Sequence, residues 1–335
     1  MKPSTPSASK NKQWILVGSL VGILCVFGHL AWTHSAMSFQ DVTSFFLGSS
    51  NQKLRTIFLF IRIPRVTAAY LCGAALSVSG LVLQTSLNNP LASASVLGIN
   101  HGSGLFVLAA SLLLPTTLLT RNIMALLGAL CAMTLLIIIS KKTGSARSTL
   151  ILIGVAISSL MSAGINILIT IWPHSISDKV SFQLGGFQSI SLSQVLWIAP
   201  LILASLLFVY THARGLDLLK LGDESAHGLG LDVQPFRMKM LVVASILAAA
   251  SVSLCGLLSF VGLIIPNVIR SWLNPDTKAA TVLCTVWGGA FLVVCDGLAR
   301  ALFYPYELPV GILLSCLGAP FFLAILMQRK RRSQL

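Results

Sequence analysis

The residues best able to carry chemistry lie in one polar stretch, LDLLKLGDESAHGLGLD, at positions 216–232. It holds four of the nine acidic residues of the chain, namely Asp217, Asp223, Glu224 and Asp232. The segments on either side are long and almost uncharged. No nucleophile–base set or metal-ligand spacing accompanies these carboxylates. The stretch therefore indicates a small amphipathic element of soluble character within an apolar protein, rather than a catalytic site.

Motifs of covalent, metal and nucleotide chemistry are absent from the sequence. It contains no HExxH, no GxSxG and no GxxxxGK[ST] phosphate loop, and His29 and His34 stand alone in an apolar run. The seven cysteines are scattered singly with no CxxC, so we expect buried thiols and neither a zinc site nor a disulfide framework. We predict no enzyme activity, no metal and no cofactor, and any driving nucleotide must bind to a separate subunit.

The composition is that of a membrane protein. Hydrophobic residues make up 55% of the chain and charged residues 10%, and the mean hydropathy is +0.87. The apolar runs are continuous, which favours membrane-spanning helices over the alternating strands of a barrel. The net charge of +14 arises from basic residues in the breaks between these runs. That distribution is a topology signal, and we predict no nucleic-acid partner.

The apolar runs predict about ten transmembrane helices. They lie at 14–36, 64–87, 91–114, 122–140, 149–172, 191–211, 279–301 and 307–328, with a longer region at 240–273. Both chain ends are basic, so the positive-inside rule puts both in the cytoplasm and requires an even number of spans. We therefore divide 240–273 into two spans at Gly256, Gly262 and Pro266, the second being a short helix over about 260–273.

The predicted fold class is thus an all-α polytopic membrane protein with some short or broken helices and both termini cytoplasmic. Its parts are a basic N-terminal tail (1–13), a single transmembrane domain (14–328) and a basic C-terminal tail (329–335). The first apolar run exceeds the roughly 7–15 residues of a signal-peptide core, so we interpret it as a retained helix.

Asp296 is the one acidic residue that falls inside a predicted span. An ion-coupled transporter keeps ionisable groups within the membrane for its proton or sodium relay. Because Asp296 lies toward the outer end of its span, we expect it to be capped by backbone or paired with Arg300 one turn later. The sequence therefore disfavours a secondary transporter.

Glycines and leucines predict short helical turns within 215–232. Leu218, Leu221, Ala226 and Leu229 recur at a spacing that gives one apolar edge. Gly222 and Asp223 suit a helix start, and Gly230 suits the position after a helix end. An ordinary solvated loop is the alternative, although such a loop does not need regularly spaced leucines.

Five ordered motifs resemble those of the permease subunits of ABC importers for iron–siderophore complexes, haem and vitamin B12. They are RIPRVTAAYLCGAALSVSGLVLQTSLNNPLASASVLGINHGSG (62–104), LILIGVAISS (150–159), LKLGDESAHGLGLD (219–232), FVGLIIPNVIR (260–270) and CDGLAR with ELPVGILLSCLGAPFF (295–322). The resemblance implies a multi-pass protein of the bacterial cytoplasmic (inner) membrane, embedded in lipid. It also implies a second permease chain, identical or related, two ABC ATPase subunits on the cytoplasmic side and a periplasmic substrate-binding protein.

The resemblance also implies roles for particular residues. It places an ATPase-coupling element at 215–232, with Leu218, Leu221, Gly222, Asp223, Glu224, Ala226, Leu229 and Gly230. Arg62, Arg65 and Arg300, on the predicted outer side, match arginines that meet acidic residues of the binding protein. Interfacial snorkelling is the alternative for these arginines.

Other positions have gating or structural roles in this comparison. A cytoplasmic gate is expected near Ser145, Ser148 and Thr149, with a plain basic loop as the alternative. Turn or structural roles are expected for Asn89, Pro90, Gly98, Pro266, Pro309 and Gly311. The chain departs from the usual pattern at Ser93-Ala94-Ser95, Asn267 and Phe182, which weakens inference about cargo.

We therefore expect a permease subunit of an ATP-driven importer, with an iron–siderophore chelate as the favoured cargo. Haem and vitamin B12 are alternative cargoes within the same family. An ion-coupled secondary transporter and a membrane enzyme are the alternatives from other classes, and both lack supporting residues.

Overall fold

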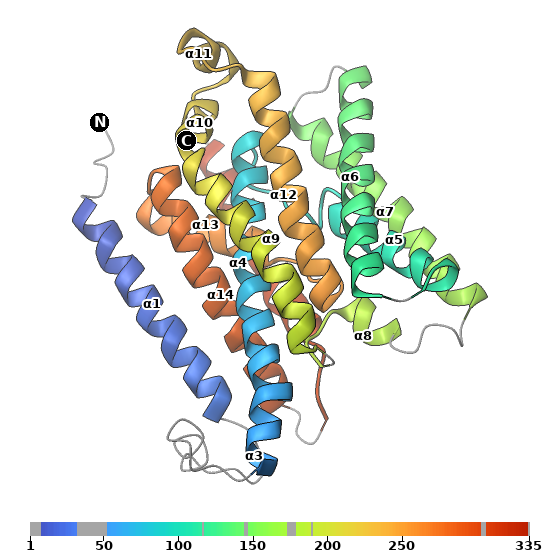
Figure 1. Cartoon of the computed structure of the whole chain (residues 1–335). Helices are drawn as coiled ribbons and strands as arrows, with labels where there is room; N and C mark the ends of the chain where they lie inside the picture. The colour runs from blue at the N-terminus through green and yellow to red at the C-terminus, as the bar shows by residue number, and fades with distance from the viewer. Residues whose placement is uncertain are drawn as a thin grey trace.

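A computed structural model describes residues 8–31, 52–115, 117–143, 147–172, 179–188, 190–302 and 306–333. Over these ranges the chain forms helices joined by turns, with no strand (Figure 1). The first half comprises α1 (Ala8–Ala31), α3 (Gln52–Ile57), the π-helical turn η1 (Phe58–Arg62), α4 (Ile63–Ser86), α5 (Ile99–Leu113), α6 (Leu118–Thr143) and α7 (Arg147–Ile171). The second half comprises α8 (Lys179–Leu184), α9 (Leu192–Thr211), α10 (Ala213–Lys220), α11 (Asp223–Gly228), α12 (Val233–Cys255), α13 (Val261–Leu273), α14 (Thr277–Ala301) and α15 (Val310–Ser333).

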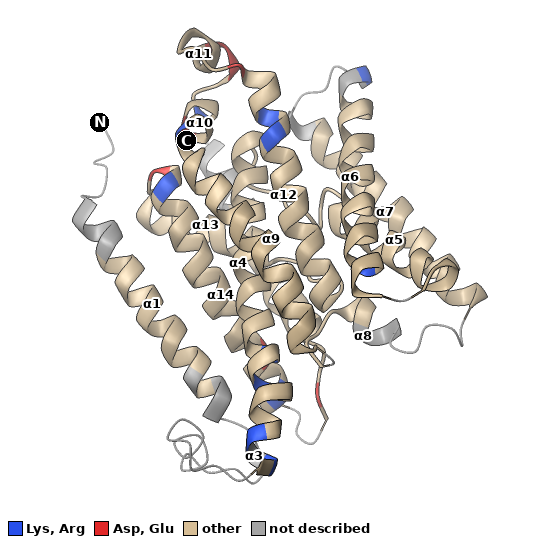
Figure 2. Ribbon diagram, viewed as in Figure 1, with Lys and Arg blue, Asp and Glu red and all other residues tan. Residues whose placement is uncertain are grey.

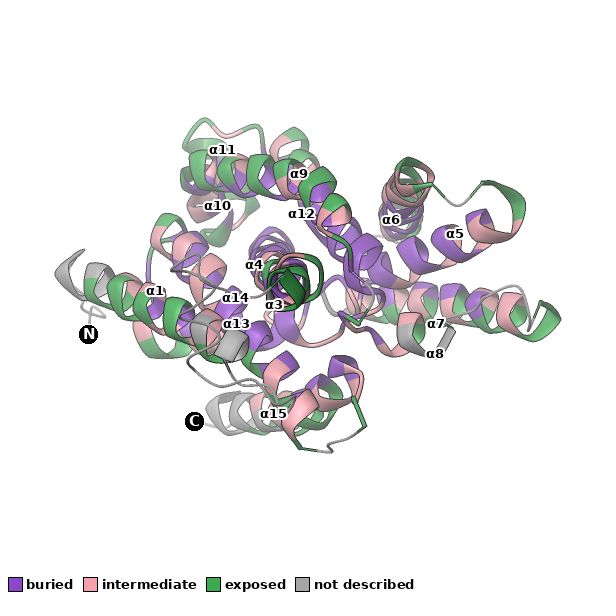
Figure 3. Ribbon diagram, turned by 60° about the horizontal axis from the view of Figure 1, so that its bottom comes forward, coloured by how far each residue is buried: buried purple, intermediate pink, exposed green. Residues whose placement is uncertain are grey.

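Helix α4 is the centre of the bundle. It packs against α9, α12, α13 and α14, and Figure 3 shows it surrounded by other helices. Nearly all of its residues are buried, including Ser77, Ser79 and Gln84. A helix that is apolar or small on every side is typical of such an enclosed position.

Glycine contacts let α4 approach its neighbours closely. A Cβ atom on Gly73 would collide with the backbone of Gly288 in α14, and one on Gly80 would collide with the backbone of Gly262 in α13. Membrane helices gain no hydrophobic energy by leaving lipid for one another, so close van der Waals contact at small residues supplies much of their association. These two crossings therefore fix α13 and α14 against the central helix.

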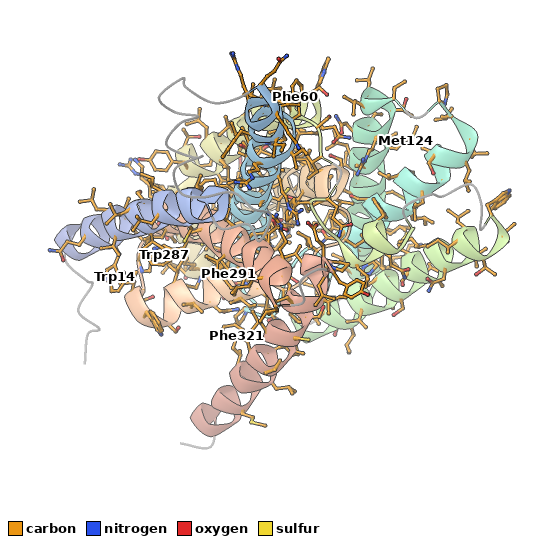
Figure 4. All side chains as sticks on the ribbon, turned by 90° about the horizontal axis from the view of Figure 1, so that it is seen from below. Trp14, Phe60, Met124, Trp287, Phe291 and Phe321 are labelled. Carbon is orange, nitrogen blue, oxygen red and sulfur yellow. The ribbon has the colours of Figure 1, made fainter. Side chains whose placement is uncertain are left out.

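Helix α1 packs on the outside of α14. Trp14 and Trp287 meet with ring centroids 6.4 Å apart, and Figure 4 shows the two side chains on the facing helices. Gly18 of α1 faces the Trp287 ring, where a Cβ atom would clash with it.

Within the described ranges, six helical segments are long and apolar enough to cross a membrane, and four apolar helices are shorter. The long ones are Arg55–Ser86, Leu118–Ser140, Thr149–Ile171, Leu192–Thr211, Val233–Cys255 and Thr277–Ala301, and the short ones are Gln13–Val26, Ile99–Leu113, Val261–Leu273 and Val310–Leu323. Each of the ten runs inferred from the sequence overlaps one of these segments. The polytopic helical fold is confirmed, and the count of ten crossings stays a prediction.

The predicted break in 240–273 is present, but several other boundaries were wrong. Residues 256–260 separate α12 from the 13-residue α13. Helix α12 begins at Val233, before the predicted start at 240. The apolar pattern missed its first turns because they carry polar residues. The expected span at 91–114 is instead a folded turn followed by the 15-residue α5, since Asn88 and Gly98 adopt positive φ. Helices α1 and α15 extend into the segments predicted as tails.

Charged residues gather toward the two ends of the bundle, and few lie along its middle among the described residues (Figure 2). Helix α1 begins and α15 ends toward the end that carries α10 and α11 (Figure 1). That arrangement agrees with an even number of crossings, and the cytoplasmic assignment of this end remains a prediction.

The glycine crossing of α4 gives the first testable expectation. Gly80→Leu should lower the thermal unfolding midpoint of the purified protein by several degrees, because the added side chain has to push α13 away from α4. Gly28→Leu is the matched control, since a Cβ atom at Gly28 meets nothing within 4 Å. Equal midpoints for the two variants would contradict the close crossing.

Candidate functional site

The α10–α11 element is a compact pair of helices closed by glycines at the predicted positions. Gly222 (φ 100°) precedes α11 and Gly230 (φ 85°) follows it, and both values are ones that L-residues rarely adopt. The Leu231 N–H donates to the Ala226 carbonyl over 3.1 Å, and the Gly230 N–H donates to His227 over 2.9 Å. These two bonds are the Schellman pattern of a helix end, so the element has a defined shape.

The predicted apolar edge of this element is divided between its two sides. Ala226 is fully buried and Leu218 is half-buried, whereas Leu221 and Leu229 are 60% and 61% exposed. The prediction of one continuous apolar surface was wrong. The chain turns at Gly222, so α10 and α11 do not share one face. Leu216 and Leu219, which the spacing argument passed over, are the buried anchors of α10.

Two of the four acids in this stretch have internal structural roles. Asp217 accepts hydrogen bonds from the Thr277 hydroxyl (2.6 Å) and backbone N–H (3.1 Å) at the first residue of α14, and from Lys220 (2.8 Å). Asp223 forms a two-point ion pair with Arg237 of α12, one contact of which measures 3.0 Å. The other two acids, Glu224 and Asp232, are exposed.

A groove of about 920 Å³ opens beside the α10–α11 element. Leu221 and Glu224 line it from one side, and Ile137 and Ser140 of α6 line it from the other. Leu150, in the first turns of α7, also reaches it. Of the residues predicted for the gate, Ser145 lies outside the described residues, Ser148 is in the first turn of α7, and Thr149 follows it and is half-buried.

The loop after α4 is held by the broken helix α13. Asn89 caps the turn by accepting a hydrogen bond from the Leu91 N–H (3.0 Å), and the Pro90 carbonyl accepts one from the Asn267 amide (2.9 Å). Asn267 is one of the departures from the family pattern, and here it ties the loop to α13. Gly98, with φ 80°, directly precedes α5.

Pro266 leaves a carbonyl without its helical partner, and α4 satisfies it. A proline has no N–H, so the carbonyl of Gly262 four residues earlier loses its helical donor. The Gln84 side chain of α4 donates to that carbonyl over 3.1 Å. Arg270 of α13 donates to the Thr85 hydroxyl over 2.6 Å. The short helix is therefore attached to α4 by hydrogen bonds as well as by the glycine crossing.

The predicted docking arginines lie at the opposite end of the bundle, and two of them are buried. Arg62 is 5% exposed, with its guanidinium 4.9 Å from the centre of the Phe58 ring, and Arg65 is 7% exposed. These positions are within η1 and α4, so snorkelling to an interface does not describe them. Arg300 is more accessible, with 23% of its side chain exposed.

Asp296 binds Arg65, a partner that the sequence did not indicate. Nε and Nη2 of Arg65 contact the two carboxylate oxygens of Asp296 at 2.8 and 2.9 Å. Nη1 of Arg65 donates to Glu307 over 2.9 Å, and Arg300 lies 3.5 Å from the other oxygen of Glu307. The cluster joins α4, α14 and the segment before α15. Sequence spacing could not reveal it, because Arg65 and Asp296 are 231 positions apart.

The start of α15 rests against the turn after α8. The Gly311 N–H donates to the Gly185 carbonyl over 3.3 Å, and a Cβ atom on Gly311 would collide with the Leu184 carbonyl. Pro309 precedes the helix, and its carbonyl accepts from Ile312 over 3.1 Å. Gly311 thus lies where a larger residue would not fit without movement of the turn. A cavity of about 440 Å³, to which the sequence gave no clue, lies beside this contact and is lined by His101 and Gln183 among others.

Comparisons with known proteins agree with this architecture. The model of the FecCD transport family matches residues 20–328. The hemin transport system permease protein HmuU of Yersinia pestis is 35% identical, over 85% of this chain and 87% of that protein. The cobalamin import system permease protein BtuC of Halobacterium salinarum is 33% identical over 92% and 82%. The Fe(3+)-citrate import system permease protein YfmD of Bacillus subtilis is 31% identical over 90% and 91%.

A solved structure shares the fold. It is described as a metal-chelate type ABC transporter in an inward-facing conformation, and it superposes with a TM-score of 0.81 at 24% identity, covering 95% of this chain and 99% of that chain. The family match spans nearly the whole sequence. The chain therefore belongs to the FecCD transport family and is a multi-pass ABC transporter permease.

Proposed function

We propose that this chain is the transmembrane subunit of an ATP-driven importer that carries an iron–siderophore-type chelate across the bacterial cytoplasmic membrane. The observation that carries the proposal is the α10–α11 element, which presents Leu221, Glu224 and Leu229 to solvent beside a groove. It does so in a chain without a phosphate loop. Such a surface suits an ATPase subunit that supplies the energy the chain cannot supply itself.

The assembly we propose has four kinds of partner. ABC ATPase subunits dock on the α10–α11 end, a periplasmic substrate-binding protein docks on the end that carries Arg300, and a second permease, identical or related, completes the path. Lipid surrounds the exposed apolar faces. Thr149 and Ser148, at the start of α7, are proposed to belong to the cytoplasmic gate.

Iron–siderophore cargo is supported by relatives named for ferric citrate import, such as the FecD permease of Escherichia coli. The relatives named for hemin and cobalamin make haem and vitamin B12 the alternative cargoes. An ion-coupled transporter is less well supported, because Asp296 is neutralised by Arg65 in a buried ion pair instead of being available to a mobile ion.

Coupling to the ATPase is tested with one charge reversal. Glu224→Lys should abolish co-purification of the ATPase while the permease stays folded in the membrane, because an exposed contact is reversed without loss of an internal bond. Asp223 is unsuitable for this test since it holds Arg237.

Asp276→Lys is the matched control for that variant. Asp276 is an exposed acid that directly precedes α14, and its side chain makes no capping hydrogen bond there. If Glu224→Lys retained the ATPase as well as Asp276→Lys does, the coupling role of α11 would be excluded.

The energy source is tested in membrane vesicles that contain the permease, the ATPase and the binding protein. Uptake of the chelate should require ATP and should persist when an ionophore collapses the ion gradients. Uptake that follows a proton or sodium gradient without ATP would overturn the proposed function.

Variants of the arginine cluster distinguish a role in docking the binding protein from a role in the stability of the permease. Arg65→Ala should destabilise the permease by about 3–5 kcal/mol, because it removes the two-point ion pair of the buried Asp296 carboxylate. Arg300→Glu disturbs only a longer, partly exposed contact with Glu307, so it should lower the unfolding midpoint less than Arg65→Ala does, and it should weaken binding of the substrate-binding protein. Binding that is insensitive to Arg300→Glu would remove this residue from the docking surface.

A further inference from the structure

Two interruptions of helical backbone meet at one place inside the bundle. Residues 256–260 connect α12 to α13, and residues 185–187 follow α8. They are joined by hydrogen bonds from Leu257 N–H to Phe182 (3.0 Å) and from Gly186 N–H to Cys255 (2.8 Å). Non-helical backbone at membrane depth is tolerated where it is buried in protein or lines a water-filled cavity. The cavity of about 440 Å³ lies at this junction.

The cavity wall combines apolar side chains with uncharged polar ones, and no formal charge lines it among the described residues. It is lined by side chains from α5, α7, α8, the 256–260 connection and α15, including His101, Ser162, Gln183, Ser259 and Ser315. No Lys, Arg, Asp or Glu lines it from the part of the chain that the structure describes. Such a wall exchanges hydrogen bonds with a ligand and has no fixed cation to neutralise an anion.

His101 is held in place by hydrogen bonds behind the cavity. Its Nδ1 atom lies 2.9 Å from the Ser158 hydroxyl of α7, and that hydroxyl is 3.3 Å from the Ser95 carbonyl. The Ser95 hydroxyl in turn lies 3.0 Å from the Ser259 hydroxyl on the cavity wall. With Nδ1 engaged, the second ring nitrogen, Nε2, is left for a ligand, as donor or acceptor according to the tautomer.

We propose that this cavity is a transit site for the cargo, and that His101 reads uncharged hydrogen-bonding groups on its surface. The site would take a neutral metal chelate rich in amide or hydroxamate groups in preference to an anionic chelate such as ferric citrate. Discontinuous helices mark substrate sites in other transporters for the same physical reason, namely that they expose backbone and small polar groups at membrane depth. The inference rests on the proposed importer function and narrows its cargo.

The test measures chelate binding to the permease–ATPase complex in lipid nanodiscs, without the binding protein. Equilibrium dialysis is run with a radio-iron-labelled neutral ferric trihydroxamate and, separately, with ferric citrate. The wild-type complex should retain the trihydroxamate more strongly. His101→Ala should weaken that retention roughly fivefold, as expected for one lost hydrogen bond.

Further variants separate recognition from folding. His101→Gln keeps a donor and an acceptor and should restore much of the retention, whereas His101→Arg should favour ferric citrate. Ser315→Leu narrows the cavity from α15 and should also weaken trihydroxamate binding. Thr134→Ala is the control, since this exposed hydroxyl of α6 bonds to the Leu130 carbonyl, away from the cavity.

ATP-driven uptake by the complete transporter is measured in parallel. If the complete transporter takes up no chelate at all, the proposed function fails. If uptake is present but the wild-type complex retains neither chelate or prefers ferric citrate, the transit site is overturned. Unchanged trihydroxamate retention in both His101→Ala and Ser315→Leu would overturn it equally.

Discussion

The close crossing of α4 with α13 and α14 positions most of the other features of this permease. In lipid, helices do not associate to escape water, so contact at Gly73 and Gly80 contributes what a hydrophobic core supplies elsewhere. The same crossing brings Gln84 to the carbonyl freed by Pro266, which allows α13 to be short and broken without an unsatisfied polar group. The broken helix, the connection before it and the cavity beside that connection follow from this packing.

The described membrane-spanning part of this protein contains little uncompensated formal charge. The acid within a described span, Asp296, is neutralised by Arg65, and the mixed apolar and uncharged polar wall of the cavity carries no formal charge among the described residues. Exposed acid and exposed leucine side chains appear together on the α10–α11 element instead. The described spans therefore offer no relay of ionisable groups, which fits the proposal that an ATPase partner drives transport.

Sequence reasoning predicted the features that depend on local pattern. The apolar runs gave the helices, the glycines at 222 and 230 gave the limits of α11, and Gly256 marked the break before α13. Sequence reasoning did not predict contacts between residues far apart in the chain. These are the Arg65–Asp296 ion pair, the hydrogen bond from Thr277 to Asp217 and the hydrogen bond between His101 and Ser158. It also failed at the apolar edge of 215–232, because one backbone turn at Gly222 decides which leucines face outward.

Helix α14 connects the two ends of the molecule in a single piece. Its first residue is fastened by Asp217 to α10, and near its other end Asp296 is fastened by Arg65 to α4. Its 25 residues form a rod about 37 Å long. One uninterrupted helix therefore joins the α10 contact to the arginine cluster, although the two contacts lie at opposite ends of the bundle.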